Sequence, residues 1–417
     1  MTMPRPTGHD VRSRVDAVAE DMLELLAATV RAPSESGWED RVAGVYADWF
    51  AGRGWPVTRQ LIGPTGLAEG EPRPEARENL VAWYPRRRGL PCVVLNGHLD
   101  VVPAGDEQQW THPPYSGLRR DGHVHGRGSV DMKGGIAAGL YALAVLEDLG
   151  VDLPFDVAVQ LVVAEETTGV GTRAAALEVP DPVAALVLEP TDGAIVPIST
   201  GLLFFTVDVT GVAAHTSAPW RGVDAFELLI RVREALAEFA RKRSASYRHP
   251  LFDGVPTAIP FAVGTARAGS WRAAVPDFAT MSGRIGLKPG EDPNAVRREV
   301  ERVLAQFAAT DDWLREHPPV VRWDHEGLPG WETPMDSPLV AALRSAQKES
   351  AGAELLTGFT AGSDAAFFGS RGIPTAIFGP GEVTKAHAPD ESVAEREVVA
   401  AAEVLALALA RLEVGDG

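Results

Sequence analysis

Histidines and carboxylates that could bind metal ions recur at separated places along this sequence. In chain order they are His98, Asp100, Asp131, Glu165, Glu166, Glu189 and His387. Imidazole and carboxylate groups are suitable ligands for divalent ions of the zinc type. Two such ions about 3.5–4 Å apart can share one bridging carboxylate and activate a water molecule. The set therefore predicts a two-metal hydrolytic site.

The first two groups of candidate ligands lie in the runs Gly97-His98-Leu99-Asp100 and Gly126 to Lys133. His98 follows a predicted strand and is a candidate metal ligand. Asp100 is a candidate for the carboxylate that fixes the tautomer of this histidine. Asp131 lies in a glycine-rich turn before a predicted helix, where the backbone can approach a ligand closely. We therefore expect Asp131 to be the bridging carboxylate.

The candidate ligands later in the chain also follow predicted strands. Glu165 and Glu166 end one strand, and such a pair can divide its work: one binds metal and the other accepts a proton from water. Glu189 ends the next strand and can complete the ligands of a second ion. His387 follows the last predicted strand.

Each of these features also has a purely structural interpretation. A His-x-Asp pair can cap a helix, two adjacent glutamates can lie on an exposed face, and an aspartate among glycines can serve a turn. All of these interpretations would have to hold at successive strand ends, so the metal site is favoured. His123 and His125 resemble a His-x-His ligand pair, but their glycine-flanked stretch favours two residues of a hairpin.

The elements that would position the site alternate between strands and helices. We expect strands at 92–96, 155–164, 184–188 and 374–378, helices at 11–30, 39–52 and 134–149, and a surface loop at 69–77. This alternation predicts an α/β domain with a mostly parallel sheet flanked by helices. Ligands of open α/β sheets bind outside the carboxyl ends of the strands, where the candidate metal ligands occur.

A different order of elements runs from residue 198 to residue 322. Strands are expected at 202–210, 257–268, 277–287 and 319–323, with helices at 223–243 and 292–309. The order β-α-β-β-α-β predicts a ferredoxin-like α+β domain. We therefore expect this domain to be inserted into a catalytic domain made of residues 1–197 and 323–417.

Composition limits the possible partners and ligands. The chain has 417 residues, which favours two domains over one core. Its net charge of −18 disfavours nucleic acid and anionic membranes as partners. Cys92 is the single cysteine, so an internal disulfide and a thiolate zinc site are excluded. No stretch resembles a signal peptide or approaches the ~20 apolar residues of a membrane span, so a cytoplasmic protein is expected.

Three motifs resemble those of the co-catalytic zinc amidohydrolases and peptidases. They are the run 97–103, the run 126–135 and the Glu165-Glu166 pair, and a C-terminal match joins Gly379-Pro380-Gly381 to the run His387 to Glu391. That family includes acetylornithine deacetylase, succinyl-diaminopimelate desuccinylase, aminoacylase and a glutamate carboxypeptidase. The resemblance covers roughly residues 11–407.

The resemblance implies a role for each matching residue. His98, Asp131 and Glu189 would hold one metal ion, and Asp131, Glu166 and His387 would hold the other. Glu165 would be the general base, and Asp100 the orienting acid. Two divalent ions per chain are implied, with zinc expected and cobalt or manganese as alternatives.

The inserted domain would be the family's lid and dimerisation domain, which implies a homodimer. Within it, the run 211–217 resembles the segment whose histidine, here His215, stabilises the oxyanion in a neighbouring subunit's active site. Arg284 resembles the lid residue that contacts the substrate carboxylate. Many members have an asparagine where this chain has Ala273, which places one lid-to-substrate contact in doubt. Ser363, next to Asp364, either lines the substrate pocket or belongs to a helix cap.

We therefore expect metal-dependent hydrolysis of a linear amide in an N-acyl amino acid or a related small N-acyl amine. A metallo-carboxypeptidase or dipeptidase is the alternative within hydrolases, because the motifs do not separate the two. The rival from another class is a metal-binding protein without turnover. That interpretation predicts that one of the candidate metal ligands is missing, yet none is. A phosphate-handling enzyme is disfavoured, because the sequence has no glycine-rich loop ending in Lys-Ser/Thr.

Overall fold

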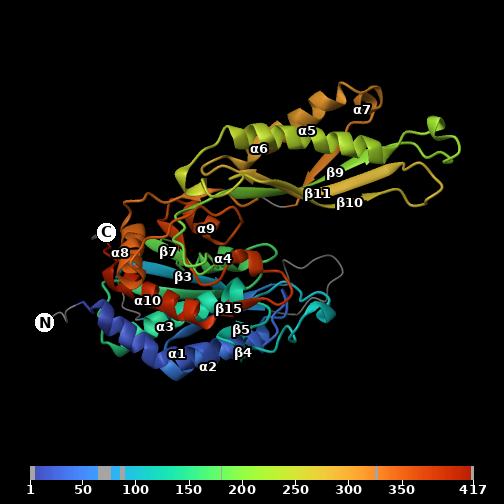
Figure 1. The fold of residues 1–417 in the computed structure, drawn as a ribbon. Helices are drawn as coiled ribbons and strands as arrows, with labels where there is room; N and C mark the ends of the chain where they lie inside the picture. Colours follow the sequence, from blue (N-terminus) through green and yellow to red (C-terminus); the bar gives the residue numbers. More distant parts are fainter. Residues whose placement is uncertain (1–4, 64–76, 85–89, 180, 325–326, 415–417) are drawn as a thin grey trace. The chain divides into compact units, whose positions relative to one another are not determined.

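The computed structural model describes residues 5–63, 77–84, 90–179, 181–324 and 327–414 (Figure 1). The chain divides into two compact units. Unit 1 comprises residues 1–197, 333–357 and 363–417, and unit 2 comprises residues 198–332 and 358–362.

The chain was expected to return from the inserted domain to the catalytic domain at residue 323, but it returns at Thr333. Leu328 bridges to Leu202 and Trp331 pairs with Ser199, so both stay with the strands of unit 2. These backbone contacts join segments far apart in the sequence. Local composition carries no sign of them, which is why the chain returns to unit 1 at Thr333 rather than ten residues earlier.

A six-stranded sheet forms the centre of unit 1. Its spatial order is β1 (Val57–Ile62), β2 (Arg77–Tyr84), β6 (Asp156–Val162), β3 (Cys92–His98), β7 (Ala184–Val187) and β14 (Thr375–Ile377). The four strands from β6 to β14 run parallel, whereas β1 and β2 are antiparallel. The predicted mostly parallel α/β sheet is thus confirmed. The loop expected at 69–77 lies outside the described residues except for Arg77, which begins β2.

Helices cover both faces of this sheet. They are α1 (Gly8–Val30), α2 (Asp40–Arg53), α3 (Gly134–Asp148), α4 (Val170–Ala175), α8 (Pro338–Ala351), α9 (Ala365–Gly369) and α10 (Glu395–Arg411). In Figure 1, α1, α3 and α10 lie on one face, and α4 and α9 on the other. The segment Ser129–Asp148 is apolar and long enough to cross a membrane, but 94% of its most apolar stretch is buried inside the protein. It therefore serves as a core helix.

Close packing of α3 depends on its glycines. A Cβ added at Gly135 would lie 1.9 Å from the carbonyl oxygen of Leu188, which follows β7. Only glycine allows this approach. The start of α3, which follows the turn of Asp131, is thereby held against the strand end that carries Glu189.

A small three-stranded sheet completes the described strands of unit 1. It consists of β4 (Leu118–Arg120), β5 (His123–His125) and β15 (Ser392–Ala394), in the order β15-β5-β4. The strands β4 and β5 form the hairpin expected around His123 and His125. The pairing of β15 with β5 joins the C-terminal motif to the run that leads to Asp131.

Unit 2 contains the elements β9 (Gly201–Thr210), α5 (Ala225–Ala245), β10 (Phe261–Ala268), β11 (Phe278–Leu287), α6 (Pro293–Ala308), α7 (Asp312–Glu316) and β12 (Val320–Trp323). The sheet order is β10-β11-β9-β12, and every pair is antiparallel. A separate pair of short strands joins β8 (Ile198–Ser199) to β13 (Trp331–Glu332). Apart from the short α7, the elements follow the expected β-α-β-β-α-β order.

The helices of unit 2 pack on one face of its sheet (Figure 1). Asp224 accepts the N–H groups of Phe226 and Glu227 and so caps α5. The apolar sides of α5 and α6 meet inward-facing strand residues such as Val207 and Met281. The sheet thus gains a core of its own, which a separate domain requires.

Candidate active site

The carboxyl end of β3 carries His98 in the middle of the unit 1 sheet. Its side chain is 1% exposed, and its Nδ1 lies 2.8 Å from the carbonyl oxygen of Asp100. Since a carbonyl only accepts, Nδ1 carries the proton and Nε2 presents its lone pair. Nε2 lies 3.0 Å from Asp131 Oδ1 and 3.9 Å from Glu189 Oε1. His98 therefore directs a potential ligand atom at two carboxylates.

Asp131 lies between two histidines that are far apart in the sequence. Its Oδ1 approaches His98, and its Oδ2 lies 3.3 Å from His387 Nε2. The peptide bond between Asp131 and Met132 is cis. One oxygen on each side is the arrangement expected of a bridging carboxylate.

A buried ion pair holds the turn that carries Asp131. Glu391 Oε2 accepts from Arg127 Nη1 at 2.6 Å, and both side chains are at most 3% exposed. Glu391 Oε1 accepts the N–H groups of Val130 at 2.9 Å and Asp131 at 3.3 Å. The C-terminal motif thus positions the candidate bridging residue through its backbone.

The side chain of Asp100 does not act as the sequence predicted. Its Oδ1 lies 3.9 Å from His98 Nδ1, too far for a hydrogen bond, and its own carbonyl oxygen fixes the tautomer instead. The carboxylate accepts the N–H groups of Glu165 at 3.1 Å and Glu166 at 3.3 Å. Ser36 Oγ also donates to it at 2.7 Å. Asp100 therefore orients the two glutamates rather than the histidine ring.

Glu166 and His387 face each other across the site. The Nε2 atom of His387 lies 3.1 Å from Glu166 Oε2, and its side chain is 51% exposed. The Glu166 side chain is 8% exposed by comparison. His387 has a positive φ of 60°, a conformation that bends the chain so that the ring points back from a surface loop.

Glu165 and Glu189 complete the cluster from the ends of β6 and β7. In one group of candidate metal-binding atoms, His98, Glu165 and Glu189 lie within 4.8 Å of one another. In a second group, the same holds for His98, Asp131 and Glu166. The structure thus brings together all five predicted metal-binding residues and Glu165. The division of ligands between two ions stays a prediction.

Burial strongly perturbs the carboxylates of this cluster. It is the main cause that raises the pKa of Glu165 well above its usual range, and the charges of Asp364 and Glu166 raise it further. Burial likewise raises the pKa of Glu189 and of Glu166, with the charge of Asp131 adding to both. Carboxylates crowded in this way favour a bound cation.

The groups that touch Asp131 shift in the opposite sense. Burial opposes ionisation of Asp131, but hydrogen bonds from His387 and His98 lower its pKa well below the usual value. The same contacts with Asp131 and Glu166 raise the pKa of His387 to about 10. The donor set has two imidazoles and four carboxylates, largely buried except for His387, which fits divalent metal ions.

His215 belongs to unit 2 and lies in the loop after β9, where it bridges to Ala274. Its Nδ1 accepts the N–H of Ser217 at 3.2 Å and lies 2.8 Å from Ser217 Oγ. Because a backbone N–H only donates, Nδ1 is unprotonated and Nε2 carries the hydrogen in the neutral ring. His215 therefore presents an N–H donor, as an oxyanion-stabilising residue must.

Arg284 also belongs to unit 2, on β11. Its Nη2 donates to the carbonyl oxygen of Thr360 at 2.8 Å, and burial lowers its pKa. Its buried Nε has no hydrogen-bond partner among the described residues. A guanidinium that is partly buried and incompletely paired is suited to bind an anionic group.

The alternative role of Ser363 and Asp364 as a helix cap is not observed. Neither side chain caps α9, which follows them. Asp364 instead accepts from Thr172 Oγ1 at 2.6 Å, and burial raises its pKa to about 7. Ser363 Oγ is buried without a partner among the described residues. That unpaired hydroxyl is consistent with the predicted substrate contact.

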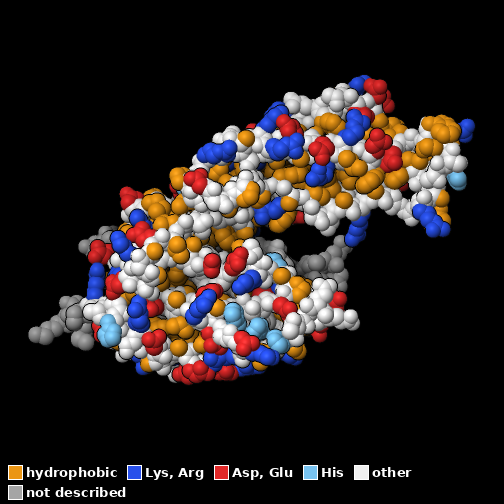
Figure 2. Space-filling view, in the orientation of Figure 1, with side chains coloured by type: hydrophobic (Ala, Val, Ile, Leu, Met, Phe, Trp, Pro, Cys, Tyr) orange, Lys and Arg blue, Asp and Glu red, His pale blue; other side chains and the backbone are white. Residues whose placement is uncertain are grey.

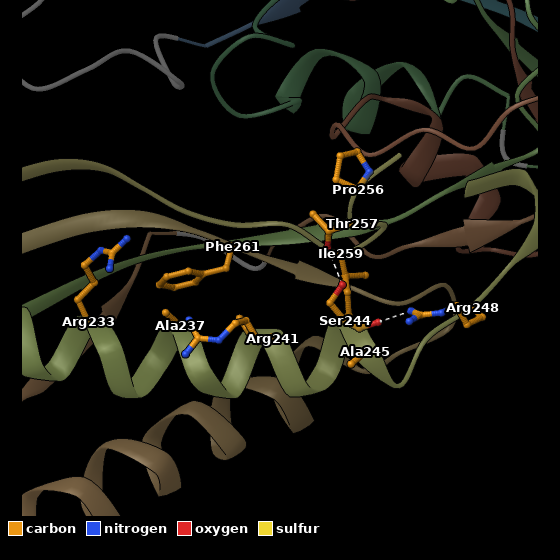
Figure 3. Close-up of a pocket in the computed structure, with 11 residues that line it drawn as sticks. Arg233, Ala237, Arg241, Ser244, Ala245, Arg248, Pro256, Thr257, Ile259 and Phe261 are labelled. Carbon is orange, nitrogen blue, oxygen red and sulfur yellow. Dashed lines mark hydrogen bonds between the residues drawn. The ribbon is translucent and has the colours of Figure 1, made fainter. Parts of the chain in front are cut away.

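A cavity of about 490 Å³ lies within unit 2 between α5 and the segment that leads into β10 (Figure 3). Arg233, Arg241 and Arg248 surround it, and Phe261 lies on the side of the strand. Neither His215 nor Arg284 lines this cavity. It is therefore separate from the two unit 2 residues predicted to act on substrate.

Comparison with known proteins places the chain in a family. Residues 94–411 match the model of peptidase family M20/M25/M40. The chain belongs to this family. It is 29% identical over 330 residues to the N-formyl-4-amino-5-aminomethyl-2-methylpyrimidine deformylase of Halalkalibacterium halodurans, covering 74% of this chain and 76% of the relative.

Two further similarities extend over more of the chain. A probable succinyl-diaminopimelate desuccinylase of Staphylococcus epidermidis is 26% identical over 402 residues, which is 90% of this chain and 93% of the relative. A dinuclear metal-binding peptidase of the M20 family from Bacillus subtilis has the same fold, with a TM-score of 0.64 at 17% identity. That alignment covers 95% of this chain and 99% of the peptidase. The predicted family is thus confirmed, and the M20 chain is a hydrolase of amide bonds.

Proposed function

We propose that this M20 protein is a two-metal deacylase that hydrolyses the linear amide of an N-acyl amino acid or a related small N-acyl amine. One observation carries the proposal. Asp131 presents one carboxylate oxygen to His98 and the other to His387, inside a buried cluster that also contains Glu166 and Glu189. The names of the relatives at 26–29% identity, a deformylase and a probable desuccinylase, favour a deacylase over a peptidase.

The chain's own residues would hold two ions in this site. His98, Asp131 and Glu189 would bind one, and Asp131, Glu166 and His387 the other, with zinc as the proposed metal and cobalt or manganese as alternatives. Ions bound there would lower the pKa of a water molecule and polarise the carbonyl of the substrate. Glu391 and Asp100 hold the backbone of Asp131, Glu165 and Glu166 in place through the hydrogen bonds described above.

Glu165 is the proposed general base. It lies within 4.8 Å of His98 and Glu189 at the potential ligand atoms, so it can reach a water held beside them. It takes one proton from the attacking water and delivers it to the leaving nitrogen. The products are then a carboxylic acid and an amine, and no other reactant is consumed.

Unit 2 supplies the proposed substrate-binding groups. His215 offers its Nε2–H to the oxyanion of the tetrahedral intermediate. Arg284 offers its incompletely paired guanidinium to an anionic group of the substrate, and Ser363 of unit 1 adds its buried hydroxyl. We further propose that unit 2 is a lid and dimerisation domain, that the protein is a cytoplasmic homodimer, and that His215 acts on the partner's site.

A substrate panel with matched variants tests the proposal. N-formyl, N-acetyl and N-succinyl amino compounds and a set of dipeptides are offered to wild type, Glu165→Gln and Glu178→Gln. Glu178 is an exposed glutamate on the same unit and serves as the control. We expect turnover of at least one N-acyl compound by wild type and Glu178→Gln, and none by Glu165→Gln. Turnover of dipeptides alone would replace the deacylase by the metallo-carboxypeptidase or dipeptidase alternative.

A further inference from the structure

Three histidine side chains gather on the small sheet of unit 1, outside the site described above. His123 and His125 are two residues apart on β5 and so project from the same face. His112, from the loop before β4, joins them. Its ring centroid lies 5.2 Å from that of His125, and the centroids of His123 and His125 lie 6.0 Å apart. Figure 2 shows histidines grouped on this surface, where Figure 1 places β5 and β15.

These separations are close to those of imidazoles that share a metal ion. Zinc–nitrogen bonds of about 2.0–2.1 Å in a tetrahedral site place two ring centroids about 5 Å apart. The pair His112 and His125 already has this spacing, and His123 lies about 1 Å beyond it. The ligand atoms of these three rings do not lie within 4.8 Å of one another as those of the His98 cluster do, so a shared ion requires the partly exposed rings to rotate towards a common point.

Backbone carbonyls select which ring nitrogen of each β5 histidine carries the hydrogen. His123 Nδ1 lies 3.0 Å from the carbonyl oxygen of Asp121, and His125 Nε2 lies 3.4 Å from that of Arg120. Since a carbonyl only accepts, each of these nitrogens donates, and the opposite nitrogen keeps its lone pair. A ring N–H held by a carbonyl is the usual outer contact of a metal-binding histidine.

The electrostatics of the group also suit a cation. Burial is the main cause that lowers the pKa of His125, and this favours the neutral ring. Asp390 lies close enough to His112 and His125 for their charges to lower its pKa. Its carboxylate accepts from Thr111 N at 2.6 Å and from Thr111 Oγ1 at 2.8 Å. These hydrogen bonds are the main cause that lowers the pKa of Asp390, so a negative charge persists beside the rings.

We propose that His112, His123 and His125, with Asp390 beside them, form an additional binding site for one divalent transition-metal ion of the zinc type. Imidazole donors select such ions over magnesium or calcium, which prefer oxygen ligands. Bound metal would fasten the loop of His112 to the β4–β5 hairpin. The site shares no residue with the His98–Asp131 cluster, so it stands or falls independently of the proposed hydrolase activity.

Zinc binding by the protein as purified, with its tightly held metal retained and quantified, tests this site. Wild type, His125→Ala, His112→Asn and the control His9→Ala are titrated with zinc by calorimetry at pH 7.5. His9 is an exposed histidine at the start of α1. We expect one additional zinc ion per chain in wild type and His9→Ala, and at least about tenfold weaker binding in the other two variants.

Thermal unfolding provides a second readout in the same samples. Zinc that binds the folded protein raises its melting temperature, so added zinc should stabilise wild type and His9→Ala more than His125→Ala and His112→Asn. Acidification to pH 5.5 should remove the additional ion, because protonated imidazoles do not bind metal. The proposal is overturned when wild type takes up no ion beyond its tightly held metal, or when the cluster variants bind zinc as tightly as wild type.

Discussion

The carboxylate of Asp100 accepts the backbone N–H of Glu165 at 3.1 Å, and this hydrogen bond fixes the position of the proposed general base. The same carboxylate holds Glu166, a candidate metal ligand, through its Oδ2. One buried side chain therefore ties the base and a ligand to the strand that carries His98. The relationship predicts that Asp100 affects catalysis through the 165–166 turn.

Replacing Asp100 by Asn tests this role. The amide keeps one acceptor oxygen but puts an NH₂ group where the second oxygen accepts from Glu166 and Ser36. We expect kcat to fall about 10- to 100-fold, as for other outer-shell partners of metal sites. Ser36→Ala is the control, because it removes one donor and leaves both backbone contacts in place. Steady-state kinetics that match wild type in Asp100→Asn would exclude the positioning role.

The buried Arg127–Glu391 pair should contribute strongly to folding. Arg127→Met leaves the Glu391 charge uncompensated inside unit 1, and loss of one partner of such a pair costs about 3–5 kcal/mol. Arg59→Met breaks the exposed Arg59–Glu78 pair, for which at most about 1 kcal/mol is expected. Urea unfolding of both variants measures the difference. Equal losses for the two pairs would contradict the structural role assigned to Glu391.

Sequence patterns located most of the site because of how parallel sheets are built. His98, Glu165 and Glu189 each follow a buried apolar strand, and the carboxyl ends of such strands converge at one edge. Three features depended on contacts that no local pattern reveals. The Asp100 carboxylate contacts Glu165, whereas the carbonyl of the same residue contacts His98. His112 lies in a loop that brings its ring beside His125. Residues 323–332 stay with unit 2.

One edge strand of the unit 1 sheet, β1, was missed for a related reason, whereas the other edge strand, β14, was expected at 374–378. In β1 buried and exposed side chains do not alternate regularly: Thr58 and Arg59 are neighbours and both are exposed. The strand lies at the edge of the sheet. Its pairing with β2 sets its conformation more than its own sequence does. Buried central strands such as β6 carry a continuous apolar pattern and were recognised for that reason.

Cys92 provides a test of burial through pH dependence. Burial raises the pKa of its thiol from 9.0 to about 12, so the folded protein keeps the proton at pH values where the unfolded chain loses it. The stability that this difference contributes is present below pH 9 and is lost as the pH rises towards 12. Urea unfolding across this pH range, with Cys92→Ala as the reference, should show a larger loss in wild type, because tyrosines and lysines titrate in both proteins.

The reactivity of the same thiol gives a direct measurement. At pH 8 the thiolate fraction of native Cys92 should be about a thousandfold lower than in the unfolded chain, given the two pKa values. A thiol reagent should therefore label native protein far more slowly than protein in denaturant. Equal labelling rates would contradict the protection that partial burial in β3 gives this thiol.

Mixed dimers test the proposed action of His215 on the partner's site. Glu165→Gln and His215→Ala are each expected to be inactive, because one lacks the base and the other the oxyanion donor. After subunit exchange, a heterodimer contains one site with both groups intact. We expect activity to return towards one quarter of wild type, roughly the level set by half the chains in heterodimers with one working site each. No recovery, with exchange verified by mass spectrometry, would place His215 on the site of its own chain.

Metal reconstitution is the most direct test of the two-metal hydrolase. Metal-free wild type is titrated with zinc while hydrolysis of the best N-acyl compound is followed, with Asp131→Asn in parallel. We expect no activity without metal, full activity after two equivalents of zinc per chain, and no recovery in Asp131→Asn. Full activity of the metal-free wild type, or normal reconstitution of Asp131→Asn, would contradict a reaction that depends on ions bridged by this carboxylate.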